Sequence, residues 1–436
     1  MVPSDQKISV IGLGRLGLPF AAVLACRGFA VTGVDRDEGR VNAVLSNADC
    51  NFEPGLSALL HQSNSNLSAT TSVREAVHET DVTFVVVDTP RTDGEVISSE
   101  NICRVMTEAG FAIARKASRQ LVVLVSTSYP GSAAQRVIPS VESGGARCGE
   151  DFDFCYSPEF VALGDAVAGF LQPEFTLIGE FDCRSGDRLQ ALYDGLYKRP
   201  TSHIRMSIAS AEVAKLALNY CLVAKLSCAN LFAGICEGIA GANVDDVTHL
   251  LTSDRRIGAG FLRGGMPYGG KCFPRDVEAI MSMEACLGAG RGLSRALASV
   301  NESRFERLLS LICGIAGGDT GLPVAILGLS FKPDTDETAG SAGMWLLKAL
   351  RGMGFPTSVH DPAVRLNIPG GPVQWEHEPD CVAAAELIVI ATPWEQYRSL
   401  DPTVLRGKRV LDCWRILSGD QREACASYTA LGVGPC

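Results

Sequence analysis

Short apolar runs alternate with stretches of helical spacing over the first 200 residues. Residues 7–13 (KISVIGL) predict a buried strand, the segment that follows predicts a helix, and residues 30–35 (AVTGVD) predict a second strand. Further strands are expected at 82–89, 121–127 and 175–180, with helical stretches between them. Strands that alternate with helices predict a parallel, doubly wound sheet.

The pattern changes after residue 205. Residues 207–243 contain no proline and keep helical spacing for more than 30 positions, so we expect a long helix that bridges domains. A second helical stretch is expected at about 274–315. Strands return at 322–330, 356–361, 386–393 and 408–414, with a helix at 341–354. The predicted fold class is therefore α/β, with two doubly wound parallel-sheet domains joined by a long central helix and a helical domain.

Composition narrows the class of protein. A chain of 436 residues is too long for one core, and 46% hydrophobic with 20% charged residues is typical of a soluble globular protein. The net charge of -10 argues against nucleic acid or an anionic membrane as partner. The first apolar run is expected to be a strand rather than a signal peptide, and no run of about 18 apolar residues suggests a membrane span.

The 16 cysteines form no CxxC pair and no zinc spacing, and the six histidines form no HxxxH pattern. We therefore expect no metal site. A reduced, cytoplasmic location is the natural interpretation.

A glycine motif, GLGRLG at 12–17, stands between the first strand and the first helix. Such glycines permit a tight turn, a close approach of a pyrophosphate and close packing of the helix. Asp35 ends the second strand, 23 residues after Gly12, where a carboxylate can accept both ribose hydroxyls. The combination predicts NAD rather than NADP, although Arg36 beside the acid weakens that choice. The alternative is a tight turn in an unrelated α/β protein.

Cys272 lies in the segment PYGGKCFPRD at 267–276. The glycine pair before it allows backbone to approach a ligand, and a helix beginning here would favour the thiolate. Asp276 would follow one helical turn later on the same face. Cys272 is thus a candidate nucleophile, and a buried, inert thiol is the alternative.

Lys215 and Asn219 are four residues apart in the predicted long helix, hence on one face. They can stabilise a developing oxyanion in a cleft, or they can belong to a solvated edge. Thr127, in STSYPG at 126–131, ends a predicted strand at the carboxyl edge of the sheet, where ligands bind. Glu159, in SPEFVALGD at 157–165, follows a proline in a turn. Taken singly, each of these two is more often part of a simple turn than of a site.

Together these motifs resemble the UDP-glucose/GDP-mannose dehydrogenase family. The similarity runs over almost the whole chain and is carried by GLGRLGLPFA, GVD, EPGL, TP, STSYPG, SPEF, AEVAKLALN, YGGKCFPRD, GLSFKPDTDE, HDP and ATPW. The GGxCFPxD block with an upstream AKLAxN is its most specific part. The resemblance implies three domains: an NAD-binding Rossmann domain (1–203), a helical dimerisation domain (204–317) and a Rossmann-like nucleotide-sugar-binding domain (318–436).

The resemblance also implies the chemistry. Family members oxidise the C6 hydroxyl of a nucleotide-linked hexose to a carboxylate with two NAD, through a thiohemiacetal and a thioester. Cys272 is then the nucleophile, Lys215 and Asn219 stabilise oxyanions, and Asp276 handles protons with Lys215 and a water. Thr127 and Glu159 match positions that hold water.

The resemblance further assigns binding residues. For the cofactor they are Gly12, Gly14, Arg15, Leu16, Gly17, Asp35, Arg40, Thr89, Pro90 and Thr127. For the substrate they are Glu159, Phe160, Val161, Ala162, Leu163, Lys215, Asn219, Arg256, Phe261, Tyr268, Gly269 and Lys332. A homodimer is implied, with the long helix as its core and Arg256 contributed across the interface.

The chain departs from the family pattern at three positions. Leu163 replaces a second glutamate, Ala339 replaces an arginine that contacts the cofactor, and Phe175 stands in PEF where the family has PDR. The SPEF and CFPRD forms favour UDP-glucose or TDP-glucose as the substrate, and GDP-mannose or a UDP-N-acetylhexosamine is second. A two-electron β-hydroxyacid-type dehydrogenase, which shares the Lys-x-x-x-Asn pair, and an NAD-binding regulator remain as alternatives.

Overall fold

The computed structural model describes residues 6–46, 53–63, 65–258, 260–290, 292–368 and 371–435. The chain divides into two compact units, Met1–Ala217 (unit 1) and Leu218–Cys436 (unit 2). The boundary falls within one long helix, α9 (Ile208–Glu237), so each unit is described by itself.

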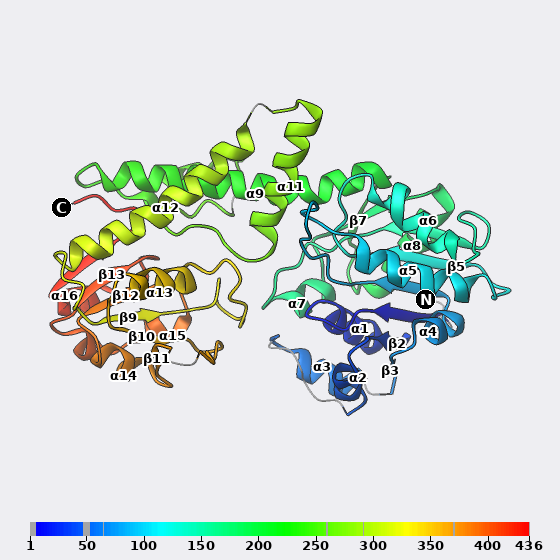
Figure 1. Cartoon of the computed structure of the whole chain (residues 1–436), viewed down its shortest axis with the longest axis horizontal. Helices are drawn as coiled ribbons and strands as arrows, with labels where there is room; N and C mark the ends of the chain where they lie inside the picture. The colour runs from blue at the N-terminus through cyan, green and yellow to red at the C-terminus, as the bar shows by residue number, and fades with distance from the viewer. Residues whose placement is uncertain are drawn as a thin grey trace. The chain divides into compact units, whose positions relative to one another are not determined.

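Unit 1 is built on an eight-stranded sheet in the order β3-β2-β1-β4-β5-β6-β7-β8 (Figure 1). The strands are β1 (Lys7–Ile11), β2 (Ala30–Val34), β3 (Leu67–Thr70), β4 (Val82–Val85), β5 (Gln120–Leu124), β6 (Phe152–Tyr156), β7 (Phe175–Glu180) and β8 (Ser202–Ser207). All neighbouring strands pair in parallel except β6 and β7, which are antiparallel. The predicted doubly wound sheet is confirmed. The direction of its strands changes once, between β6 and β7, because the chain enters β7 from the opposite edge of the sheet.

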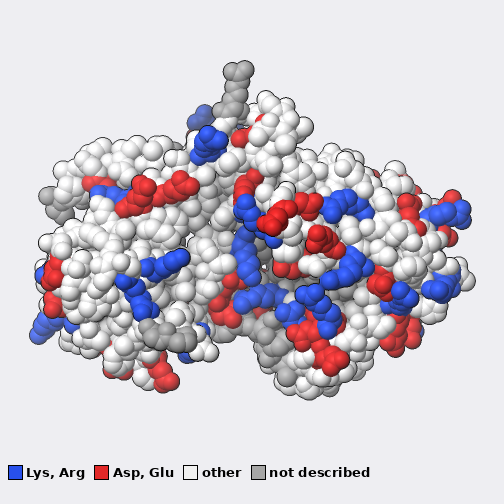
Figure 2. Space-filling view, in the orientation of Figure 1, with Lys and Arg blue, Asp and Glu red and all other residues white. Residues whose placement is uncertain are grey.

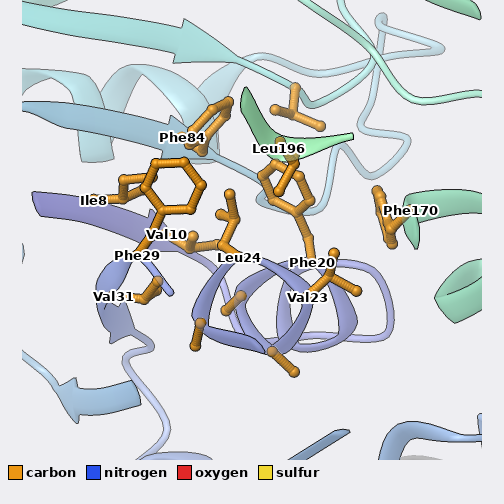
Figure 3. Close-up of a cluster of buried hydrophobic side chains, with 14 of the residues drawn as sticks. Ile8, Val10, Phe20, Val23, Leu24, Phe29, Val31, Phe84, Phe170 and Leu196 are labelled. Carbon is orange, nitrogen blue, oxygen red and sulfur yellow. The ribbon is translucent and has the colours of Figure 1, made fainter. Parts of the chain in front are cut away.

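Helices cover this sheet: α1 (Gly17–Cys26), α2 (Glu38–Leu45), α3 (Leu56–Ser63), α4 (Val73–Glu79), α5 (Glu100–Ile113), the π-helix η1 (Ala133–Val137), α6 (Ile138–Ser143), α7 (Ala166–Leu171) and α8 (Cys183–Leu196). Helix α1 is buried almost all round. Figure 3 shows its side chains among those of the strands, and the rings of Phe20 and Phe84 meet edge to face at 4.9 Å. This packing fixes the glycine turn that precedes α1.

Helix α9 is 30 residues long, as the proline-free pattern predicts. By length and composition alone it could cross a membrane, contrary to the expectation that no segment could. This is weak evidence, because core helices of soluble proteins pass the same test. The helix also places Glu212, Lys215 and Asn230 in buried positions, and their side chains bond to the protein. Such contacts are typical of a core helix.

Unit 2 begins with three further helices, α10 (Val244–Ser253), α11 (Cys272–Leu287) and α12 (Leu293–Ile315). Two helices, α11 and α12, occupy the helical stretch that was expected at about 274–315. Helix α11 ends at Gly288, whose left-handed backbone (φ 66°) stops the helix at low cost because glycine has no side chain.

The second sheet has six strands, all paired in parallel, in the order β11-β10-β9-β12-β13-β14. The strands are β9 (Val324–Leu327), β10 (Thr357–His360), β11 (Val373–Gln374), β12 (Leu387–Ile390), β13 (Arg409–Asp412) and β14 (Ser427–Ala430). The helices between them are α13 (Ala342–Gly352), α14 (Glu378–Ala383), α15 (Glu395–Arg398), the 3-10 helix η2 (Pro402–Leu405) and α16 (Gly419–Ala424). The second open α/β sheet is therefore confirmed.

Charged side chains are spread over the surface. Figure 2 shows acidic and basic groups interspersed on the face it draws, in line with a chain of net charge -10. The described cysteines are free thiols.

Candidate active site

The turn between β1 and α1 has the geometry of a dinucleotide site. Gly12 has a φ of 99°, and a Cβ there would lie 2.3 Å from the Val86 carbonyl oxygen. A Cβ on Gly17 would lie 1.7 Å from the Gly12 carbonyl oxygen, so α1 can pack this closely only on glycine. A Cβ on Gly14 would lie 3.8 Å from the Arg40 guanidinium, and Gly14 is partly exposed. The backbone of the turn is thus accessible to a phosphate.

Asp35 stands at the end of β2 beside this turn. It is 8% exposed and accepts hydrogen bonds from the backbone N–H of Leu13 (2.9 Å) and of Asp37 (3.0 Å). The Arg40 guanidinium donates to the same carboxylate at 3.3 Å. An acid fixed next to an open glycine turn fits the adenosine ribose of a dinucleotide.

The other residues expected at the cofactor follow the same strands. Arg15 and Leu16 complete the turn before α1, and Leu16 is the residue at its N-cap. Thr89 is buried and Pro90 exposed in the segment after β4. They lie at the carboxyl edge of the parallel strands, where ligands of such sheets bind.

A second group of unit 1 forms around Lys215 on α9. Its ammonium donates to the Glu159 carbonyl oxygen at 2.5 Å and lies over the Phe160 ring, 4.4 Å from the centroid. Burial raises the pKa of the Glu159 carboxyl to about 7, although the charge of Lys215 acts to lower it. A carboxyl with such a pKa can both accept and release a proton near neutral pH.

The loop that carries Glu159 is held by Glu53 of the EPGL segment. The buried carboxylate of Glu53 accepts the N–H groups of Gly164 (2.8 Å) and Ala166 (2.6 Å). Val161 and Leu163 are partly buried in this loop and Ala162 is exposed. Sequence reasoning quoted EPGL as a family motif but did not give its glutamate a role.

Glu212 fixes the turn that follows Thr127. Its buried carboxylate accepts the Ser128 hydroxyl (2.9 Å) and the N–H groups of Gly131 (2.6 Å) and Ala133 (2.9 Å). Thr127 itself is partly exposed. Because Glu212 precedes Lys215 by three residues on α9, one helix anchors both this turn and the Glu159 loop. Sequence reasoning missed Glu212, and the only signal was its place in the AEVAK segment.

In unit 2, Cys272 is exposed and is the first residue of α11. Asp276, one turn later, is fully buried and accepts the Asn219 amide at 2.6 Å. The Arg275 guanidinium pairs with the same carboxylate at 2.8 Å. The structure therefore brings Asn219 and Asp276 together, one helical turn from the candidate nucleophile.

The segment before Cys272 is tightly supported. Asn301 clamps the backbone of Tyr268, accepting its N–H at 2.8 Å and donating to its carbonyl at 3.2 Å. Burial raises the pKa of the Tyr268 hydroxyl to about 12. A Cβ on Gly269 would lie 2.0 Å from the Gly340 carbonyl oxygen, so the glycine is required by close packing.

The remaining expected residues lie on loops of unit 2. Arg256 follows α10, its side chain is 84% exposed, and it pairs with Asp254 at 2.5 Å. Phe261 has a left-handed backbone (φ 57°) and is 47% exposed. Lys332 is partly buried on the segment after β9.

The expected residues thus fall into two groups. Unit 1 contains the cofactor residues together with Thr127, the 159–163 loop and Lys215, and unit 2 contains the others. Over the described ranges, no cluster of three or more His, Cys, Asp or Glu side chains could hold a metal ion.

Comparison with known proteins decides the family. Three models of the UDP-glucose/GDP-mannose dehydrogenase family match in order: the NAD binding domain at 6–197, the central domain at 209–303 and the UDP binding domain at 325–419. The chain belongs to this family. It binds NAD through its first domain and a nucleotide-sugar through its third, and the family consists of NAD-dependent nucleotide-sugar 6-dehydrogenases.

Relatives of known function match nearly the full length. The chain is 33% identical to the UDP-glucose 6-dehydrogenase AglM of Haloferax volcanii, covering 95% of this chain and 97% of that one. It is 32% identical to a GDP-mannose 6-dehydrogenase of Pseudomonas savastanoi pv. phaseolicola, over 93% and 95%. A solved UDP-glucose dehydrogenase from Pyrobaculum islandicum superposes with a TM-score of 0.91 at 30% identity, over 99% and 100%. The chain is about equally similar to relatives that act on different sugar nucleotides, so these identities do not distinguish between the substrates.

Proposed function

We propose that this chain oxidises the C6 hydroxyl of UDP-glucose or TDP-glucose to the carboxylate, with two NAD as hydride acceptors. The observation that carries the proposal is the exposed Cys272, one turn before a buried Asp276 that holds the Asn219 amide. A thiol is needed for the second oxidation, because an aldehyde must gain a heteroatom before it can lose another hydride.

The first oxidation needs a base and a charge that stabilises the alkoxide. The hydroxyl gives its proton to a base and a hydride to NAD, which leaves an aldehyde. Lys215 supplies the positive charge, and Asp276 with a water takes the proton. The bonds of Lys215 to the Glu159 loop support this role, because they orient its ammonium before the substrate arrives.

The second oxidation uses the thiol. The sulfur of Cys272 bonds to the aldehyde carbon and the thiol proton moves to the oxygen, which gives a thiohemiacetal. Loss of a hydride to the second NAD and of the hydroxyl proton to a base gives a thioester. Water then attacks the thioester, the C–S bond breaks, and the carboxylate and the free thiol are formed. Glu159 fits the base of this last step, since its pKa of about 7 lets it accept a proton from water.

The three departures do not remove these groups. Phe175 packs against Phe160, with ring centroids 5.1 Å apart, and so supports the Glu159 loop from the neighbouring strand. Because Leu163 stands where the family has a second glutamate, Glu159 is the carboxyl that remains in this loop to act on water. Ala339 contributes its backbone, since its carbonyl accepts the N–H of Gly270 at 3.1 Å.

A cytoplasmic homodimer is part of the proposal. Helix α9 carries large apolar side chains that are about half exposed, Val213 and Leu231 at 51% and Ile235 at 49%. A second copy of the chain would cover such a face. Arg256, on its exposed turn, would then reach the partner's substrate site.

The test is the amount of NADH formed at the end-point from limiting UDP-glucose, with TDP-glucose in parallel. We expect two NADH per sugar from the native enzyme, and fewer than two, with a trappable aldehyde, from Cys272→Ala. The nucleotide-sugar that is oxidised faster identifies the preferred nucleobase, uracil or thymine.

Other outcomes select the alternatives. Full turnover by Cys272→Ser would favour a two-electron dehydrogenase of the β-hydroxyacid type. Inactivity on both glucose nucleotides would contradict the substrate assignment and lead first to GDP-mannose and UDP-N-acetylhexosamines. NAD binding without turnover of any of these sugars would indicate a regulator.

A further inference from the structure

The two sheets repeat one arrangement at their first strands. Gly12 after β1 and Gly328 after β9 have φ values of 99° and 103°. Each donates its N–H to the last residue of the neighbouring strand, at 2.7 Å and 2.8 Å. The next residue in each case, Leu13 or Leu329, donates its N–H to the aspartate that directly follows that strand, Asp35 or Asp361.

The repeat includes the helix that follows. A Cβ on Gly17 would lie 1.7 Å from the carbonyl oxygen of Gly12, and a Cβ on Gly343 would lie 2.1 Å from that of Gly328. The two glycines are five residues apart in unit 1 and fifteen apart in unit 2. The second sheet thus keeps the turn geometry but contains a longer segment, residues 329–342, within it.

The aspartate of the second turn is fully occupied. Asp361 is 1% exposed and accepts the N–H and hydroxyl of Ser330, the Trp394 indole and the N–H groups of Ala363 and Val364. Asp35, by comparison, retains some exposure beside an open glycine turn. Asp361 in the second turn therefore stabilises the fold, whereas Asp35 in the first turn is the acid expected to bind a ribose.

The longer segment contacts the residues before Cys272. The Ala339 carbonyl accepts the N–H of Gly270 at 3.1 Å. Glu337, 7% exposed, pairs with the Lys271 ammonium at 2.9 Å and accepts the N–H of Ala339 at 2.9 Å. The fit is tight as well, since a Cβ on Gly340 would lie 3.0 Å from the Gly270 nitrogen.

We propose that residues 331–341 are a positioning segment for the Cys272 thiol, with Glu337 and Gly340 as its positioning residues. This rests on the proposed function, because it assigns to the segment the second oxidation, in which sulfur must reach the aldehyde carbon. The residues that it fixes, 269–271, lead directly into the first turn of α11, so their position sets where the thiol stands. An error of about 1 Å in such a position can cost about 100-fold in rate.

The experiment compares Gly340→Ala with Gly317→Ala. Both glycines have a left-handed backbone (φ 63° and 68°), so both substitutions impose similar strain, but a Cβ on Gly317 meets nothing within 4 Å. Glu337→Gln is the second variant, which removes the charge opposite Lys271 while an amide oxygen can still accept the Ala339 N–H.

Two readouts are measured on the full-length protein. Amide hydrogen exchange at Gly270 and its neighbours reports the support directly and needs no turnover. We expect exchange there at least ten-fold faster in Gly340→Ala than in Gly317→Ala. For UDP-glucose, we expect NADH per sugar to fall below two and an aldehyde to be trapped in Gly340→Ala, with a smaller effect in Glu337→Gln. Formation of the first NADH should slow less than formation of the second.

Three results decide the proposal. Equal exchange rates in Gly340→Ala and Gly317→Ala would show that residues 331–341 do not support the segment before Cys272. Faster exchange with two NADH per sugar at a native rate overturns the role in positioning the thiol. If the native enzyme oxidises none of the sugar nucleotides, the proposed function fails, and the exchange comparison still decides whether the segment holds the Cys272 turn.

Discussion

Glu159 offers a prediction that can be worked out from its environment. Burial raises the pKa of its carboxyl from 4.5 to about 7. Since the folded-state pKa lies above the unfolded value, the folded protein binds more protons between about pH 4.5 and 7, and this group destabilises the fold progressively as the pH rises through that window. Replacing Glu159 by Gln removes this dependence, because an amide does not titrate.

The size of the effect follows from the two pKa values. At about 1.4 kcal/mol for each unit of pKa, full ionisation of Glu159 costs about 3 kcal/mol of folding free energy. At pH 5 the cost is only about 1 kcal/mol, because the folded carboxyl is still protonated. The stability of Glu159→Gln relative to native should therefore rise by about 1–2.5 kcal/mol between pH 5 and pH 8, the lower value allowing for the partial exposure of the residue.

Urea unfolding at the two pH values measures this change. All four tryptophans lie in unit 2, so tryptophan fluorescence reports that unit, whereas circular dichroism also follows the unit that contains Glu159. The exposed Glu79→Gln on α4 is the control, and the change in stability difference between the two pH values should be larger for Glu159→Gln than for Glu79→Gln. A Glu159→Gln difference that is equal at pH 5 and pH 8 would refute the argument from burial.

Three more predictions concern other parts of the chain. Asp35→Asn should raise KM for NAD about ten-fold and improve the relative use of NADP, since the charge that repels a 2′-phosphate is lost and Arg40 is released; initial rates with both cofactors test this. Arg304→Leu should cost about 3–5 kcal/mol of unfolding free energy, because it breaks the 2.8 Å buried pair with Glu237, and Glu237→Gln in the same chain should recover part of the loss in a urea titration. Gly12→Ala should abolish NAD binding in calorimetry, because its Cβ would lie 2.3 Å from a carbonyl oxygen.

The sequence by itself predicted both parallel sheets and the long helix, because their signals are local. Alternating strands and helices, the glycine turn at 12–17 and an acid at the end of the second strand arise from short stretches of chain. The spacing of Cys272 and Asp276, or of Lys215 and Asn219, is likewise a property of one helix. The break at Gly288 was missed, since a single glycine between two helical patterns does not reveal a left-handed backbone.

What only the tertiary structure decided is which groups meet across long distances in the chain. Glu53 binds the backbone at 164–166, Glu212 binds the turn at 128–133, and Glu337 pairs with Lys271. No local sequence pattern marks these carboxylates, because their partners are backbone N–H groups and a lysine, which occur throughout any sequence. Burial, which raises the pKa of Glu159, is also a property of the packed fold. The sequence therefore predicted the candidate reacting groups, and the fold decided which carboxylates bond to the segments around them.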